Sequence, residues 1–191
     1  MKRWPVETKP RRPASWQWVM AFQSASSPHL SALACFMFLT GARIGESVSL
    51  RWSDLDLSKS TVLLRQTKTG TERLAHLPPD LIVALANISY GGPASSRVFQ
   101  MDRHSAWRQW KRAVERAGIE YMSPHSCRHG FATSLLQAGV DPVTVAKLGG
   151  WTGVTQLWAT YGHAREDRTI TDLLTQKDSG DIHKHLNIKK A

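Results

Sequence analysis

Four side chains suited to binding phosphate or moving protons stand out in the sequence: Arg43, Lys68, His125 and Arg128. If the segment after residue 124 is helical, His125 and Arg128 are three residues apart and share one face of its first turn. The first turn of a helix also presents free N–H groups and a positive dipole, which suit an anion such as phosphate. Two arginines, a lysine and a histidine that converge on one point would therefore form a phosphate-binding site.

Other chemistries for the same region have weaker support. His125 and His129 are four residues apart, as in zinc enzymes, but Ser126 follows the first histidine, so the HExxH pattern is absent. Cys127 would face away from His125 on the same helical turn, which makes a Cys–His pair awkward. Trp151 is a residue type found more often in a core than in a catalytic site. We therefore expect no metal, no cofactor and no cysteine nucleophile.

The charge balance points to a polyanionic partner. The 191 residues include 25 Lys and Arg against 15 Asp and Glu, which gives a formal net charge of +10. A domain this basic usually binds nucleic acid, although a merely basic surface would give the same total. The longest apolar stretch, residues 30–39, is too short to span a bilayer. With two cysteines and no apolar run behind the basic start, we expect a cytoplasmic protein without disulfides.

Helix-start and helix-stop residues predict a mostly helical fold. Ser15 is placed to cap a helix that continues through Met20, and Pro28 opens an apolar helix that Gly41 would end. A short helical turn is expected from Gly45 to Leu50. Further helices are expected at 80–88, 105–117, 125–138, 142–148 and 153–161.

One segment departs from the helical pattern. Residues 61–66 are β-prone, a turn candidate with Lys68 near its tip follows, and a more polar stretch runs over 72–77. This pattern predicts a β-hairpin, so the expected fold class is α+β, mostly helical with a small antiparallel sheet. Along the chain, we expect a basic extended lead-in over 1–13, one globular domain over 14–175 and a polar tail over 176–191.

The wording of the motifs in the first half adds a family resemblance. Residues 40–46, Thr-Gly-Ala-Arg-Ile-Gly-Glu, resemble the first arginine motif of tyrosine recombinases, the phage integrase family. Residues 66–70, Gln-Thr-Lys-Thr-Gly, together with Leu-Pro at 77–78, resemble the hairpin lysine of that family and its downstream proline.

The second half continues the resemblance in the same order. Residues 125–129, His-Ser-Cys-Arg-His, match the HxxR box of the family. Residues 148–151, Leu-Gly-Gly-Trp, match the position that holds His or Trp, and residues 161–163, Tyr-Gly-His, match the nucleophile motif. The resemblance covers most of the chain and implies that residues 14–175 form a tyrosine recombinase catalytic domain.

The resemblance implies a role for each motif residue. Tyr161 would attack a backbone phosphate and release a 5′-hydroxyl, which leaves a 3′-phosphotyrosine without any metal or ATP. Arg43 and Arg128 would bind the non-bridging oxygens, because the arginine fork holds two oxygens and keeps its charge. His125 would move protons to and from the tyrosine, and Lys68 would protonate the departing 5′-oxygen. The implied catalytic residues are Arg43, Lys68, His125, Arg128, Trp151 and Tyr161.

Two residues have supporting roles in this scheme. Trp151 would hydrogen-bond the phosphate through its indole N–H or support the site by packing. Glu46, one helical turn from Arg43, is expected to contact that arginine rather than the DNA.

The implied partner is double-stranded DNA, bound by a homo-oligomer (a tetramer) with accessory DNA-bending proteins and no membrane. Two alternatives stay open: a type IB topoisomerase, which relaxes DNA as a monomer, and a DNA-binding regulator or inactive remnant of a longer integrase. The intact motif set argues against the regulator. The core-binding domain that usually precedes such a catalytic domain is missing from the 191 residues, so we expect either a fragment or a short recombinase.

Overall fold

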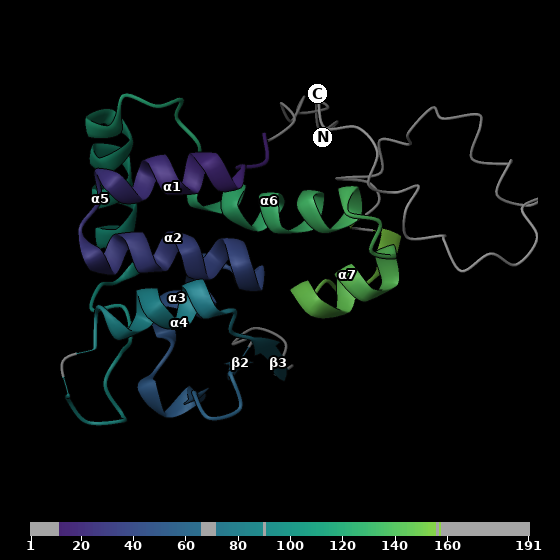
Figure 1. The fold of residues 1–191 in the computed structure, drawn as a ribbon, viewed down its shortest axis with the longest axis horizontal. Helices are drawn as coiled ribbons and strands as arrows, with labels where there is room; N and C mark the ends of the chain where they lie inside the picture. The colour runs from purple at the N-terminus through teal and green to yellow at the C-terminus, as the bar shows by residue number, and fades with distance from the viewer. Residues whose placement is uncertain (1–11, 66–71, 90, 156, 158–191) are drawn as a thin grey trace, which may run out of the picture.

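A computed structural model of the chain describes residues 12–65, 72–89, 91–155 and 157. Helices make up most of these ranges, and a small sheet follows the third helix (Figure 1). The elements in chain order are α1 (Trp16–Ser24), α2 (Pro28–Thr40), α3 (Ile44–Ser49), η1, a 3-10 turn (Trp52–Asp54), β1 (Leu55–Asp56), β2 (Thr61–Arg65), β3 (Glu72–His76), α4 (Pro79–Ala86), α5 (Arg103–Ala117), α6 (Pro124–Gln137) and α7 (Pro142–Gly149).

Local sequence signals explain where these helices begin and end. The Ser15 side chain accepts a backbone N–H of α1, Pro28 occupies the first turn of α2, and Gly41 ends α2 with a left-handed φ of 65°. These boundaries confirm the predictions. Helix α5 begins two residues earlier than expected, because the Asp102 carboxylate caps it by accepting a backbone N–H at 2.7 Å. Most of the helix expected at 153–161 lies outside the described residues.

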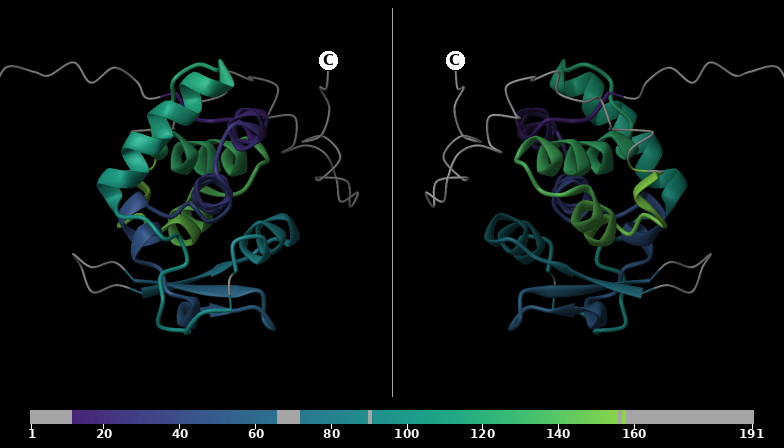
Figure 2. Two further views of the ribbon diagram at one scale, coloured as in Figure 1. Left: turned by 90° about the vertical axis from the view of Figure 1, so that its left-hand side faces the viewer. Right: turned by 90° about the vertical axis from the view of Figure 1, so that its right-hand side faces the viewer.

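The sheet is antiparallel, with the strand order β1-β2-β3. The predicted hairpin is confirmed: β2 pairs with β3, so that Val62 lies opposite Ala75 and Leu64 opposite Arg73. The short strand β1 was not expected from the sequence. Val62 and Leu64 are buried in the core that the sheet shares with the helices. The helices form a layer above the sheet (Figure 2).

A large apolar core joins α1, α2, α5 and the sheet, and α6 packs along α2. Its largest buried rings include Phe22, Phe36 and Trp110. A smaller cluster, built on Ala132 and Val145, attaches α7 to the second half of α6. This packing brings the C-terminal ends of α2 and α7 close together (Figure 1).

None of the described helices is long and apolar enough to cross a membrane. The expected lead-in over 1–13 falls outside the described residues apart from Arg12 and Pro13, and the expected tail over 176–191 falls wholly outside them. The boundaries of these segments therefore stay predictions.

Candidate active site

Arg128 joins the two helix ends. It lies on α6 and is buried, with 6% of its surface exposed. Its Nη1 donates hydrogen bonds to the carbonyl oxygen of Gly41, just after α2, and at 2.6 Å to that of Gly149, at the end of α7. Its guanidinium carbon lies 3.8 Å from the centre of the Trp151 ring, a cation–π contact that also orients the group.

Arg43 reaches the same end of α7 from another element. It is the N-cap of α3, and its Nη1 donates to Glu46 Oε1 at 2.7 Å. The second oxygen of Glu46 accepts the backbone N–H of Arg43 at 2.9 Å, and Arg43 Nη2 donates to the Gly150 carbonyl oxygen at 3.2 Å. The Arg43 side chain is still 36% exposed, so its charge is accessible to an anion.

Two glycines allow these close approaches. Gly41 adopts a left-handed φ of 65°, and a Cβ atom there would lie 2.7 Å from the Phe131 ring. A Cβ atom on Gly149 would lie 1.7 Å from the Trp151 ring. A larger residue at position 41 would have to displace the Phe131 ring, and one at position 149 would displace the Trp151 ring that contacts Arg128.

Arg73, which was not predicted from the sequence as a site residue, also binds these two helix ends. From β3, its Nη1 donates to the carbonyl oxygens of Leu148 at 2.7 Å and Thr40 at 3.3 Å. Its Nη2 lies 3.8 Å from Glu46 Oε2. Burial lowers the pKa of Arg73 to about 10, which leaves it charged at neutral pH. One signal in the sequence could have indicated this. In a strand, Arg73 lies two residues before Ala75 and so shares its face, and Ala75 is buried.

His125 lies in the first turn of α6, one turn before Arg128, as the spacing predicts. Its ring centre is 6.3 Å from that of Trp107 on α5. Helix α5 therefore borders the histidine end of the site, and its surface is strongly basic. The exposed basic residues of its first three turns are Arg103, His104, Arg108, Lys111 and Arg112.

The structure thus brings Arg43, Arg128 and Trp151 together, and His125 lies on the same helix as Arg128. Lys68 and Tyr161, the expected acid and nucleophile, lie outside the described residues. Within those residues, no three His, Cys, Asp or Glu side chains are grouped so that they could hold a metal ion.

The thiols are unsuited to nucleophilic attack. Cys127 is fully buried and Cys35 is 1% exposed. Burial raises the pKa of the Cys127 thiol far above its usual range and that of Cys35 to about 12, so both stay protonated at neutral pH.

A comparison with known families decides the relationship. The model of the phage integrase family matches residues 18–168. The chain belongs to the phage integrase family. The resemblance carried by the motifs is therefore confirmed, and the site just described lies within the matched range. Arg43, Arg128 and Trp151 all lie within the matched range.

Curated relatives carry recombinase names. The chain is 37% identical to the tyrosine recombinase XerD of Mycobacterium tuberculosis in an alignment of 134 positions, which covers 62% of this chain and 43% of the relative. It is 32% identical to the tyrosine recombinase XerA of Saccharolobus solfataricus over 111 residues, 58% of this chain and 38% of the relative. The chain thus spans less than half the length of these relatives.

Solved structures confirm the predicted fold. The crystal structure of XerA recombinase superposes with a TM-score of 0.68 at 24% identity. The superposition covers 93% of this chain and 70% of the XerA chain. The catalytic domain of bacteriophage HP1 integrase gives a TM-score of 0.68 at 18% identity, with 87% of this chain and 95% of that one covered. This family member therefore has the α+β, mostly helical fold of a tyrosine recombinase catalytic domain.

Proposed function

We propose that this chain is the catalytic part of a site-specific DNA recombinase, which cleaves and rejoins DNA through a 3′-phosphotyrosine. The observation that carries the proposal is the meeting of Arg43 and Arg128 at the end of α7, beside Trp151. Two guanidinium groups held by backbone carbonyls are preorganised, so they need not rearrange when a phosphate arrives. Membership of the phage integrase family supports the same reaction.

In this proposal the two arginines stabilise the phosphorus as it becomes five-coordinate. Negative charge then builds up on the non-bridging oxygens, and Arg43 and Arg128 bind them. The partly exposed Arg43 would contact the phosphate from the solvent side, whereas the buried Arg128 would contact the phosphate from the protein side. The Trp151 ring lies against the Arg128 guanidinium and so restricts its movement.

The proton transfers balance the bond changes. The Tyr161 oxygen forms a bond to phosphorus while the bond from phosphorus to the 5′-oxygen breaks. A free tyrosine has a pKa of about 10, so its proton must be removed, and His125 is the proposed acceptor. Lys68 gives a proton to the departing 5′-oxygen. Attack by a 5′-hydroxyl on the phosphotyrosine reverses these steps and rejoins DNA, with no metal or other cofactor.

Helix α5 is the proposed contact with double-stranded DNA. Its exposed cations adjoin the histidine end of the site, and the whole chain carries a net charge of +10. Phosphate contacts by such side chains supply affinity and fix register on the duplex. Two structural neighbours are a lambda integrase dimer bound to a COC′ core site and XerH bound to its difH substrate. We extend this to a tetramer of the present chain on DNA, with accessory DNA-bending proteins.

The test of the proposed function is covalent capture on nicked suicide DNA, whose short cleaved strand diffuses away and traps the adduct. The wild-type chain is expected to form an adduct at a defined position, and Tyr161→Phe is expected to bind the same DNA and form none. Tyr121→Phe is the matched control, because Tyr121 is an exposed tyrosine before the HxxR box, and it should react normally.

Other outcomes would point to other functions. An adduct in Tyr161→Phe but not in Tyr121→Phe would reassign the nucleophile. Relaxation of supercoiled DNA without a preferred site would indicate a type IB topoisomerase. Binding to DNA without any adduct, in every sequence tried, would indicate a DNA-binding regulator.

A further inference from the structure

We propose that Arg73 is a positioning residue for the candidate active site. Arg73 holds Glu46, and through Glu46 it holds Arg43, against the C-terminal end of α7. Its importance for cleavage rests on the proposed function, but its contacts can be tested without any reaction.

Two arginines, Arg73 and Arg128, bind the same pair of chain segments, and a third, Arg43, binds one of the two. Arg73 binds one carbonyl at the end of α2 and one near the end of α7, and Arg128 binds the next carbonyl along each segment. Arg43 binds the carbonyl that follows. We call these backbone acceptors the carbonyl clasp. It consists of Thr40, Gly41, Leu148, Gly149 and Gly150.

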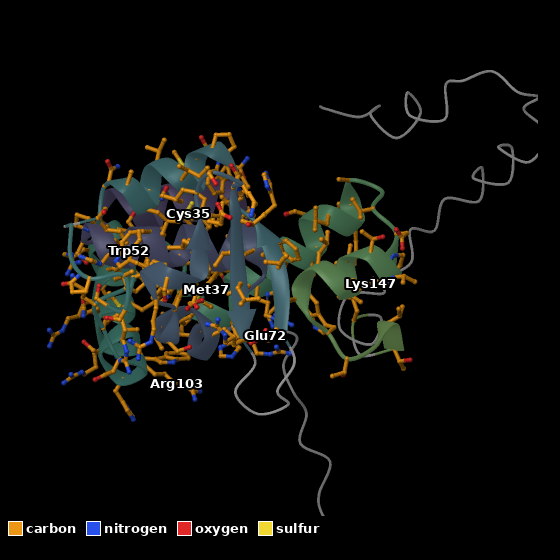
Figure 3. The ribbon with its side chains drawn as sticks, turned by 90° about the horizontal axis from the view of Figure 1, so that it is seen from below. Cys35, Met37, Trp52, Glu72, Arg103 and Lys147 are labelled. Carbon is orange, nitrogen blue, oxygen red and sulfur yellow. The ribbon has the colours of Figure 1, made fainter. Side chains whose placement is uncertain are left out.

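Arg73 occupies the strand position that can reach the clasp. Along β3, Leu74 is 67% exposed, whereas Ala75 is buried, so Arg73 shares the inward face of Ala75. Strand β3 runs along the side of the sheet nearest to α7, as the positions of Glu72 and Lys147 show in Figure 3. Carbonyls at the end of a helix lack partners within the helix and attract positive charge, which suits a guanidinium there.

Burying the charged Arg73 guanidinium costs free energy, and an apolar side chain could fill the same space without that cost. The Arg73 side chain is 11% exposed, and its Nε and Nη2 have no hydrogen-bond partner among the described residues. Replacing a buried ionic group with a well-packed apolar one is often neutral or stabilising. Stability alone therefore gives little reason for an arginine at this position, whereas a need to orient Glu46 gives a specific one.

Glu46 transmits the effect to Arg43. Glu46 Oε2 accepts the Arg43 backbone N–H and faces Arg73, while Oε1 holds the Arg43 side chain. The carboxylate is buried between two cations, so loss of one cation lets it turn towards the other or towards water. Either movement shifts the Arg43 guanidinium, and a small displacement of a catalytic group can lower a reaction rate strongly.

The first experiment measures backbone amide exchange in the full-length chain without DNA. In Arg73→Gln, the amides of Arg43 and of residues 149–151 are expected to exchange at least about tenfold faster, because these segments open locally. Amides of α5 should not change. The control is Arg65→Gln, which removes the same charge from the neighbouring strand, where Arg65 pairs with Asp54 and Glu72 outside the clasp.

The second experiment measures DNA binding and single-turnover cleavage on nicked DNA. Arg73→Gln is expected to keep the Kd within about threefold and to cleave at least about tenfold more slowly, a barrier change near 1.4 kcal/mol. Arg73→Lys should recover part of this rate, because it restores the charge beside Glu46. The variant Arg73→Gln with Glu46→Gln should be slowed by less than the product of the two single effects, because both act through Arg43.

The outcomes separate the two proposals. Absence of an adduct in the wild type would overturn the proposed function, and the exchange experiment would still decide the contacts of Arg73. If Arg73→Gln and Arg65→Gln have equal amide exchange rates and equal cleavage rates, the proposed role of Arg73 is overturned. If Arg73→Gln does not fold, Arg73→Lys decides the matter: it should exchange faster around Arg43 than Arg65→Lys, and equality would overturn the proposal.

Discussion

At the scale of single residues, Arg43 combines a structural and a chemical task. It holds Glu46 and the Gly150 carbonyl while its side chain stays partly exposed to solvent. A lysine has one nitrogen and no planar fork, so it cannot hold two acceptors and bind a phosphate in the same geometry. We expect Arg43→Lys to cleave DNA at least about tenfold more slowly than wild type, measured as single-turnover adduct formation.

Arg116→Lys provides the matched control for this substitution. Arg116 also binds a backbone carbonyl through two nitrogens, that of Ala25, but it does so at the far end of α5. This variant is expected to cleave at the wild-type rate. Equal rates in the two variants would mean that Arg43 does not contact the phosphate.

The buried thiols give a prediction about pH. In the unfolded chain a cysteine ionises near pH 8.5, whereas burial raises the pKa of Cys35 to about 12 and that of Cys127 still higher. A raised pKa in the folded state stabilises the fold below the unfolded pKa, and this contribution is lost as pH rises. Between pH 9.5 and 10.5, each thiol should lower the free energy of unfolding by about 1.4 kcal/mol.

Urea denaturation at these two pH values would measure the effect. The variant Cys35→Ala with Cys127→Ala keeps the other titrating groups, so it should lose about 2.7 kcal/mol less than wild type over this interval. An identical pH dependence in both proteins would show that the thiols are not buried from water in solution.

At the scale of elements, the turn between α2 and α3 depends on one glycine. Gly41 combines a left-handed φ with contact to the Phe131 ring, so Gly41→Ala strains the backbone and also forces the ring to move. We expect a loss of at least about 2 kcal/mol in the free energy of unfolding, measured by urea titration. Gly45→Ala should have no such cost, because a Cβ there meets nothing within 4 Å inside α3, where alanine is favoured. A similar loss in both variants would contradict this reading.

Elements with local signals could be predicted from the sequence, and those set by distant partners could not. Ser15, Pro28 and Gly41 mark helix ends by their own chemistry, and the hairpin follows from β-prone runs on either side of a turn. Strand β1 has two residues, and it exists because Leu55 pairs with Val62. Arg73 was missed for the same reason, since its acceptors lie 33 and 75 residues away in the chain.

At the scale of the whole molecule, the site lies where three arginines hold helix ends and a sheet together. The motif order predicted Arg43 and Arg128, and the fold shows that Gly41 leaves room for the Phe131 ring and Gly149 for the Trp151 ring beside Arg128. The basic surface of α5 begins at the histidine end of this site and extends the positive charge along the helix. If one DNA phosphate binds in the site, neighbouring phosphates of the same DNA backbone would therefore contact the basic residues of α5.

This arrangement predicts how binding responds to salt. Each phosphate contact adds roughly 0.9 to the slope of log K against log salt, so Arg108→Gln with Arg112→Gln should lower that slope by about 2. The matched pair Lys59→Gln with Arg97→Gln removes the same charge from two exposed residues outside α5, and should leave the slope unchanged. Fluorescence anisotropy on labelled duplex DNA between about 50 and 200 mM salt covers the range in which such slopes are steep. With its net charge of +10, the 191-residue chain is expected to bind duplex DNA with an affinity near the micromolar range at physiological salt. Equal slopes in the two double variants would place the DNA on a surface other than α5.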